Sequence, residues 1–471
     1  MLISRFVIVV ILSMAVLSAC ATLPEDRGKG DVNRLVAERT TGVLPAADLD
    51  ATEYLSELLV QPLTASAAVH IALMNNPRLR AEYAHLGIAA AEVYNAGRLS
   101  NPRFGVSVMY SDEPGTANQV TFGLTQSFTD LLLLPARSRL AAAEFERAKL
   151  EVGAAVIDFA AETEEAYFRL VGAQQVATMR ANVAGAAAAS ALLAERFYQA
   201  GNISALEFTL EQSAASHAKL AAMRAGTDVV AARNALNRLM GLKAGDTRWS
   251  TPDQLHLPVT VEDNLDDLIE LAWRSRLDLS ARQAQVALLA DSLGVSRQFR
   301  FLGESEIGIE TERETDRSRI TGPSLSLELP IFNTGAGRVA QAEALVDQAE
   351  AELQALALDI GNDVQLAHAQ VQASRAVFEQ YRDALVPERE AVVQLTQQQV
   401  SYMLEGQFQL LFVKQQEFDA YQGYLEALRD YWIARTQLRR AVGAQLPSDR
   451  GIEGPQVGPR DVTQHTTGEK Q

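Results

Sequence analysis

One amphipathic helix pattern occurs twice in this chain of 471 residues, about 200 residues apart. In the first copy the apolar or small residues follow alternating steps of four and three, at Leu79, Tyr83, Leu86, Ala90, Val93 and Gly97. The second copy keeps the same register with Leu279, Gln283, Val286, Ala290 and Leu293. This spacing is the coiled-coil period. Because the two copies align without a gap, we expect a duplicated fold built from packed helices.

Each helix pattern is followed by two runs in which apolar and polar residues alternate. Asn76-Pro77 gives the first helix a good N-cap and a favourable first turn, and Asn101-Pro102 ends it. Then come RFGVSVMY and QVTFGLTQSF, and their counterparts in the second half are GESEIGIET and PSLSLELPIF. Alternation with a period of two is typical of β-strands. We predict one strand pair at about 102–112 and 118–129, and a second at about 300–312 and 319–332.

A very long helix is expected after each strand pair, from about 136 to 199 and from about 337 to 402. A helix of this length extends roughly 100 Å. Each helix ends in a turn with a glycine, Gly201 or Gly406, where a left-handed residue would end a helix. A returning helix then completes each unit. The chain therefore repeats a unit of helix, two strands, long helix and returning helix.

The expected layout follows from these units. It comprises a signal peptide at 1–19, an N-terminal segment at 20–62, a first repeat at 63–241, a linker at 242–263, a second repeat at 264–445, and a polar, disordered tail at 446–471. The linker and the tail are assigned from their Gly, Pro and polar content.

The first 20 residues predict export and a lipid anchor. Arg5 precedes an apolar run from Phe6 to Val16, which is too short to span a bilayer and is typical of a secretory signal. It ends in Leu-Ser-Ala-Cys, which resembles a bacterial lipobox, so Cys20 is the expected site of lipid attachment. The alternative is a signal peptide with an incidental cysteine. Ala21 follows the cysteine, and the absence of an aspartate there favours the outer membrane.

Four strands per chain cannot close a membrane barrel by themselves. An open sheet edge in lipid leaves backbone groups unsatisfied, and single-chain barrels begin at about eight strands. Two copies would give eight strands and three copies twelve, with room for a channel. The predicted lumen face carries Glu304, Glu306, Glu310 and Glu328. The alternative is a soluble sheet domain within a coiled-coil protein, with these glutamates on an ordinary solvated surface.

Composition argues against nucleic-acid binding and against enzymatic chemistry. The formal net charge of −17 disfavours a nucleic-acid partner, because binding its phosphates requires a basic surface. The six histidines are scattered, so no metal site is predicted. GAGR at 335–338 lacks the lysine of a phosphate-binding loop, and no nucleophile and base can be assembled from spacing. We expect neither a cofactor nor a catalytic site.

The chain resembles the outer-membrane efflux protein family, the TolC-like channels, particularly lipidated members paired with resistance-nodulation-division pumps. The resemblance covers about residues 50 to 445. It is carried by the lipobox, by the two glycine-containing helix turns, and by PLTASAAVHIALMNNPRLRAEYAHLGIAAAEVYNAGRLSNPRF and GPSLSLELPIFNTGAGRVAQAEA.

This resemblance implies a mostly α-helical fold with a membrane β-barrel. It implies a homotrimer in which a twelve-stranded barrel in outer-membrane lipid continues into a periplasmic barrel of helices. The partners would be a periplasmic adaptor protein and an inner-membrane pump of the resistance-nodulation-division type. The channel itself would be passive and would open where the long helices turn, at 198–206 and 402–411.

The gate residues are expected by position, because the aspartates of the best-known family member have no counterpart in Leu411–Gln416. The candidates are polar or turn residues and two aromatic residues that could seal the entrance: Gly201, Asn202, Glu405, Gly406, Gln407, Phe408, Gln409 and Phe412. The alternative is that all of these residues simply face neighbouring helices.

The function expected is an exit duct that conducts drugs or metal cations out of the periplasm. The alternative is a periplasmic coiled-coil adaptor or structural envelope lipoprotein, which should carry one helical hairpin flanked by β-rich domains. The sequence leaves the choice of substrate open.

Overall fold

The computed structural model describes residues 26–37, 39–40, 59–110, 112, 115–245, 249–449 and 456–457. The chain divides into two compact units. The strand unit consists of Met1–Val32, Ala81–Val152 and Leu277–Ala357, and the helical unit of Asn33–Arg80, Gly153–Arg276 and Leu358–Gln471. Cys20 lies outside the described residues.

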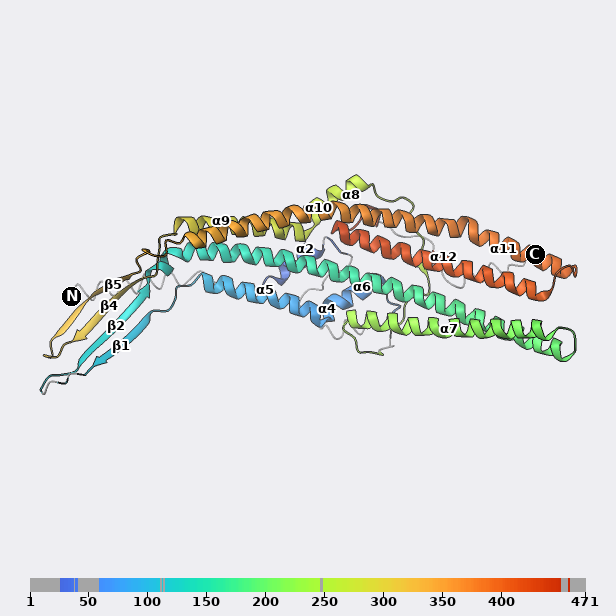
Figure 1. The fold of residues 1–471 in the computed structure, drawn as a ribbon, viewed down its shortest axis with the longest axis horizontal. Helices are drawn as coiled ribbons and strands as arrows, with labels where there is room; N and C mark the ends of the chain where they lie inside the picture. The colour runs from blue at the N-terminus through green and yellow to red at the C-terminus, as the bar shows by residue number, and fades with distance from the viewer. Residues whose placement is uncertain are drawn as a thin grey trace. The chain divides into compact units, whose positions relative to one another are not determined.

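The strand unit contains one four-stranded antiparallel sheet. Its strands are β1 (Arg103–Met109), β2 (Gln119–Ser127), β4 (Ser305–Arg313) and β5 (Arg319–Leu327). They lie in the order β1-β2-β4-β5, so the strand pair of each repeat joins the other through β2 and β4 (Figure 1). The strands are shorter than predicted at several ends. Before β4, for example, the chain is still in helical turns, since Phe299 N–H donates to the Val295 carbonyl at 3.0 Å.

The helices of the first half are α2 (Lys29–Ala37), α4 (Ala65–Asn75), α5 (Pro77–Ala96), α6 (Phe128–Gln199) and α7 (Ala205–Leu239). Helix α6 begins eight residues before the predicted start, because the Ser127 side chain accepts from Asp130 N–H and caps it. Pro135 is accommodated inside the helix. The Arg137 side chain donates to the Asp130 carbonyl at 3.2 Å. The neighbouring Leu131 carbonyl has no backbone donor four residues later, because Pro135 lacks an N–H.

The second half contains α8 (Leu265–Ser275), α9 (Leu277–Gln298), α10 (Ala336–Gln380), α11 (Val386–Ser401) and α12 (Gln407–Val442). A π-helical turn, η1 (Tyr381–Leu385), joins α10 to α11. It lies just before Pro387, whose ring would clash with the carbonyl four residues earlier in a regular helix. The ring of Tyr381, the first residue of this turn, packs against Gly423 of α12. A Cβ at Gly423 would lie 2.4 Å from the Tyr381 ring.

Short elements lie in the segments predicted as linker and disordered tail. Strand β3 (Leu255–His256) pairs with β6 (Gln456–Val457), and a 3-10 turn, η2, spans Pro447–Asp449. The prediction of a disordered tail is therefore wrong for residues 447–449 and 456–457. The physical reason for the order at η2 is an ion pair between Asp449 and buried Arg435, described below.

One described helix, α6, is long and apolar enough to cross a membrane by length and composition. It contains an 18-residue window with a mean hydropathy of 1.2, of which 11% is buried.

Asn76 holds the start of α5 in the helical unit. Its side-chain oxygen accepts from Arg78 N–H at 2.7 Å, as expected of an N-cap. Its Nδ2 donates to the carbonyls of Leu239 at 2.7 Å and Arg238 at 3.1 Å, near the end of α7. The residue is 3% exposed, so these carbonyls have little access to water. The cap therefore also ties α5 to the returning helix.

Replacing Asn76 with alanine should lower the free energy of unfolding by about 2–3 kcal/mol, because the cap is lost and two carbonyls lose a donor. Denaturant titration would measure this change. The control is Asn264→Ala, which removes the N-cap of α8, a single 2.8 Å bond to Asp266 N–H at an exposed position. If the two substitutions cost the same, the buried carbonyl contacts contribute nothing.

Candidate functional site

The sheet has one apolar face and one polar face. The strand register aligns Phe104 with Leu124 and Leu124 with Ile309, and it aligns Ile307 with Leu325. Directly paired residues point to the same side of a sheet, so the apolar residues of all four strands share one face. They stay exposed, for example Phe104 at 69%, Ile309 at 60% and Leu325 at 64%. Such an exposed apolar face is typical of a surface that contacts lipid.

The opposite face carries three glutamates of β4. Glu306, Glu310 and Glu312 alternate with the apolar residues of this strand. Arg103 of β1 forms an ion pair with Glu306 at 2.7 Å, and Gln119 donates to Glu312. Two of the predicted lumen residues, Glu306 and Glu310, therefore lie on this face. Glu312 was missed, although it continues the same alternation.

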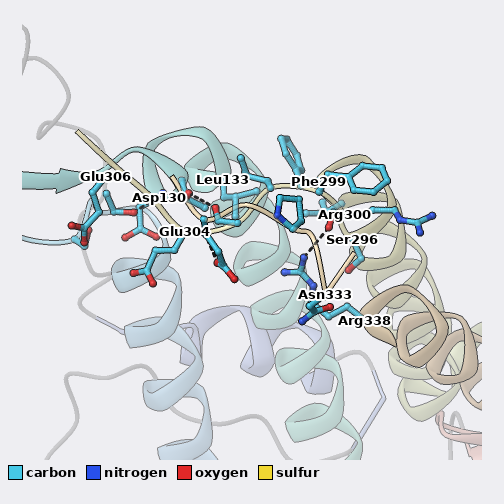
Figure 2. A pocket seen from close by; sticks show the side chains of 18 of the residues that line it. Asp130, Leu133, Ser296, Phe299, Arg300, Glu304, Glu306, Asn333 and Arg338 are labelled. Atoms are coloured by element: carbon cyan, nitrogen blue, oxygen red, sulfur yellow. Dashed lines mark hydrogen bonds between the residues drawn. The ribbon is translucent and has the colours of Figure 1, made fainter. Parts of the chain in front are cut away.

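The other two predicted lumen residues lie where the strands meet the helices. Glu304 precedes β4 and Glu328 follows β5, and a Glu328 carboxylate oxygen accepts from Glu304 N–H at 2.9 Å. They line a pocket of about 500 Å³ with Asp130 of α6 and with Arg300 and Arg338 (Figure 2). The pocket thus has carboxylates and guanidinium groups, contributed by both halves of the chain.

The first predicted turn has the expected geometry. Gly201 follows α6 with φ of 77°, the left-handed conformation that favours glycine. Asn202 N–H donates to the Phe197 carbonyl at 2.8 Å, which closes the helix end. Ser204 and Glu207 then form a capping box that starts α7. Gly201 and Asn202 are both exposed.

The second turn uses a different residue from the one predicted. Gly406 has φ of −82° and is the N-cap of α12, so the prediction that it is left-handed is wrong. Met403 adopts φ of 57° instead, and Leu404 N–H donates to the Gln399 carbonyl at 2.9 Å. The helix end is the same as in the first turn, but a non-glycine residue carries the strain. Met403 is 94% exposed, so its side chain has few contacts with the rest of the chain.

A groove of about 410 Å³ brings some of the gate candidates together with α6 and α7. Phe408, Gln409 and Phe412 line one side of it, and small residues such as Ala187 and Ala214 line the other. Five further candidates do not line this groove: Gly201, Asn202, Glu405, Gly406 and Gln407. The groove is largely apolar, with Glu207, Glu211 and Lys414 at its lining. Small residues along a helix allow another helix to approach closely.

A buried carboxylate lies one turn further along α12. Glu417 is 2% exposed and forms an ion pair with Lys414. Burial raises the pKa of Glu417, and the nearby Lys414 ammonium only partly offsets this effect. The Tyr421 hydroxyl and Glu390 are hydrogen-bonded to each other in the same region.

Because the pKa of Glu417 is raised on folding, the folded state binds its proton more tightly than the unfolded state. The protein should lose stability as the pH rises from the ordinary value of 4.5 through the raised pKa. Glu417→Gln should therefore be more stable than the wild type at neutral pH, and this difference should shrink at acid pH. Denaturant titrations at several pH values would measure it. A difference that stays constant with pH would show that Glu417 does not titrate this way.

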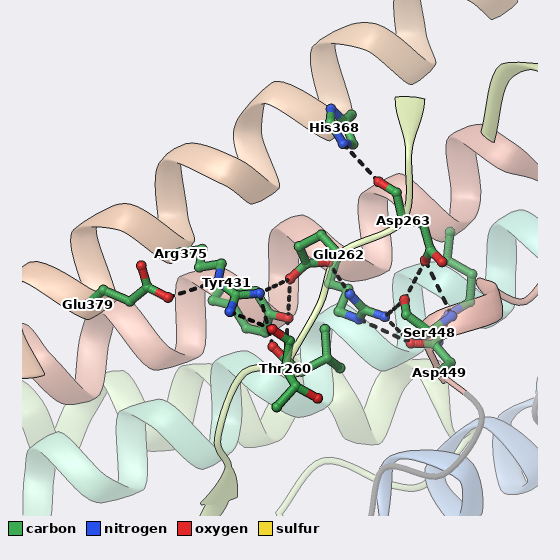
Figure 3. Close-up of polar contacts among 12 residues, drawn as sticks. Thr260, Glu262, Asp263, His368, Arg375, Glu379, Tyr431, Ser448 and Asp449 are labelled. Carbon is green, nitrogen blue, oxygen red and sulfur yellow. Dashed lines mark hydrogen bonds and ion pairs between the residues drawn. The ribbon is translucent and has the colours of Figure 1, made fainter. Parts of the chain in front are cut away.

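The helical unit also contains a buried ion network (Figure 3). Arg435 of α12 is 0% exposed. Its guanidinium pairs with Glu262 and with Asp449, the latter at 2.8 Å, and donates to the Ser448 hydroxyl at 2.5 Å. Arg375 pairs with the same Glu262 at 3.3 Å. The network therefore joins α10, α12, the segment before α8 and the η2 turn.

Among the described residues, no group of three or more His, Cys, Asp or Glu side chains is arranged to hold a metal ion.

The model of the family described as outer membrane efflux protein matches residues 68–242 and 268–444. The chain belongs to the outer membrane efflux protein family. The family resemblance predicted from the sequence is thus confirmed. The predictions that the chain is a transport protein of the outer membrane and that it is not an enzyme are confirmed as well. An adaptor or structural lipoprotein is not supported.

This outer membrane efflux protein is similar to the cobalt-zinc-cadmium resistance protein CzcC of Cupriavidus metallidurans. The two are 25% identical over 336 residues, which is 69% of this chain and 77% of CzcC. Among solved structures, it matches the outer-membrane channel OprN with a TM-score of 0.68 at 18% identity, covering 86% of this chain and 98% of that one. It matches CusC with a TM-score of 0.67 at 16% identity, covering 86% and 96%. These likenesses confirm the predicted fold of long helices with a strand domain.

Proposed function

We propose that three copies of this efflux protein form a passive exit duct across the outer membrane. The observation that carries the proposal is the four-stranded sheet with one exposed apolar face, one polar face and two edge strands, β1 and β5. In lipid, each edge must pair with another strand. Joining β1 of one copy to β5 of the next would close three sheets into a twelve-stranded barrel, wide enough for a channel.

In this arrangement the apolar face contacts lipid and the polar face lines the duct. The glutamates of β4 from the three copies then form rings of carboxylates in the lumen. The negative electrostatic potential of these rings attracts cations. The similarity to CzcC supports metal cations as substrates, alongside drugs. The signal peptide and Cys20 would give the mature chain a lipid anchor in the same membrane. The three predicted segments from 63 to 445 would form the duct, and 20–62 its anchored N-terminal segment.

The helix turns form the periplasmic entrance in this proposal. Glu405, Gln407 and Gln409 would line it as polar rings, while Phe408 and Phe412 would narrow it. A periplasmic adaptor protein would contact the outside of the same turns. The energy for transport would come from an inner-membrane pump of the resistance-nodulation-division type.

Recording ion currents across planar bilayers would test the duct. The protein should give discrete conductance steps, with a reversal potential in a KCl gradient that favours cations. Glu310→Gln removes one carboxylate per copy from the polar face and should move that potential toward zero. Glu350→Gln on α10 is the control and should leave it unchanged. A protein that inserts as an oligomer but never conducts would contradict the duct, and an unchanged potential in Glu310→Gln would place that glutamate outside it.

A further inference from the structure

The apolar face of the sheet changes its chemistry in step along β4 and β5. From the helix side outward, the register pairs on this face are Ile307 with Leu325, Ile309 with Pro323, Thr311 with Thr321, and Arg313 with Arg319. The hydroxyls of the two threonines are hydrogen-bonded to each other at 3.2 Å. Both strands therefore pass from aliphatic residues through threonine to arginine at the same level. The arginines lie at the end of the sheet away from the start of α6 (Figure 1).

Arg313 and Arg319 are directly opposite each other across the two strands. Side chains in such a position have Cβ atoms about 4.5–5.5 Å apart, and like charges at this spacing destabilise a strand pair. Both arginines are exposed. In the part of the chain that the structure describes, neither forms an ion pair with a carboxylate. The register thus places two positive charges side by side without a negative partner.

The acidic residues of the β4–β5 hairpin lie elsewhere. Glu312 belongs to the polar face, where Gln119 donates to it. Glu314 N–H donates to the Ser318 carbonyl at 3.0 Å, so this pair extends the ladder, and the alternation of a strand places Glu314 on the same side as Glu312. The Asp316 carboxylate accepts from Ser318 N–H at 2.7 Å within the turn. In β4 and β5, the charged residues of the apolar face are therefore the two arginines.

The neighbours of the arginine pair on β1 and β2 are apolar and exposed. Arg313 is in register with Val120, and Val120 with Val108, which is 44% exposed. Tyr110 follows two residues later, just after the end of β1, and is 80% exposed. In membrane barrels, aromatic residues form girdles at both edges of the apolar band. The arginine pair therefore lies where the apolar band of this sheet ends.

We propose that Arg313 and Arg319 together bind the headgroup phosphate of a lipid in the membrane leaflet that lies away from the helices. Arginine suits this role because its fork of donors matches phosphate oxygens. A phosphate held between the two guanidinium groups supplies the negative charge that the hairpin lacks on this face. The acyl chains of the lipid then lie along the apolar residues of the same face. The inference rests on the proposed membrane placement of the sheet.

Native mass spectrometry of the full-length protein, delipidated in detergent, would test the proposal. The probe is phosphatidylglycerol, and diacylglycerol with the same chains is the reference without phosphate. The variant is Arg313→Gln with Arg319→Gln. The matched control is Arg282→Gln with Arg297→Gln, which changes the net charge equally but removes arginines of α9 that pair with Glu352 and Glu343.

The variant should bind phosphatidylglycerol on the order of tenfold more weakly than the wild type, because two cationic contacts to the phosphate are lost. The control should bind it as the wild type does. Diacylglycerol, which offers no phosphate, should not discriminate among the three proteins.

Equal binding of phosphatidylglycerol by the variant and the wild type would overturn the proposal. So would displacement of the lipid by millimolar inorganic phosphate in an arginine-dependent way, because the pair would then be a site for a soluble anion. The same spectra report the number of chains. An oligomer without arginine-dependent lipid would refute only this inference, whereas a single chain would refute the proposed duct.

Discussion

Replacing Arg435 with methionine should lower the free energy of unfolding by about 3–5 kcal/mol, the range expected when one member of a buried ion pair is removed. The reason is that the buried Glu262 and Asp449 would lose the cation they share and keep only one cationic partner each, Arg375 and Arg439. Their side chains are 6% and 9% exposed, so water cannot replace the guanidinium. Methionine keeps most of the packing of the arginine stem, and the loss therefore reports the charge. Urea titration in detergent would measure it.

The matched control for Arg435 is Arg440→Met on the same helix. Arg440 pairs with Asp158 at 2.7 Å, but both side chains are about half exposed. Exposed pairs contribute about 0–1 kcal/mol, so this variant should remain close to the wild type. A further variant with Glu262→Gln and Asp449→Asn added to Arg435→Met should recover part of the loss. If Arg435→Met is no less stable than Arg440→Met, the network does not hold the η2 turn and the helices together.

Replacing Ile309 with lysine should reduce the stability of the membrane-inserted protein by about 2–4 kcal/mol per copy, as expected for a cation on the lipid face of a barrel strand. Ile309 pairs in register with Leu124 and Pro323 in the middle of the sheet, and its side chain is 60% exposed. Unfolding and refolding with urea in lipid vesicles would measure the effect.

The control for Ile309 is Thr121→Lys. Thr121 lies on the polar face and pairs in register with Ser107 and Glu312, so a lysine there has a carboxylate neighbour and water. We expect little change in stability. Equal costs for the two lysines would contradict the assignment of one face to lipid and the other to the lumen.

The parts of the fold that could be predicted are those encoded by local repetition. The alternation of Phe104, Val106 and Val108 predicted their shared face, because side chains of a strand alternate between its two sides. Gly201 could be assigned to a left-handed position because glycine pays no steric cost there. The family could be predicted because the helix-strand-strand-helix unit occurs twice.

The remaining features depend on contacts that are distant in sequence or on local competition. Glu262 and Asp449 lie 173 and 14 residues from Arg435, and no spacing links them. The left-handed residue of the second turn is Met403 and not Gly406, because α11 ends at Ser401 and the glycine serves as the N-cap of α12. The ion pairs of Arg282 with Glu352 and of Arg297 with Glu343 join α9 to α10 and could not be predicted from the sequence, because no local spacing links these residues.

The native mass of the membrane-extracted protein tests the central claim most directly. The duct requires that the two edge strands of each sheet pair with neighbouring copies, so the intact species should have three times the mass of its denatured chain. A native species with the mass of one chain would leave β1 and β5 unpaired in lipid and would contradict the account.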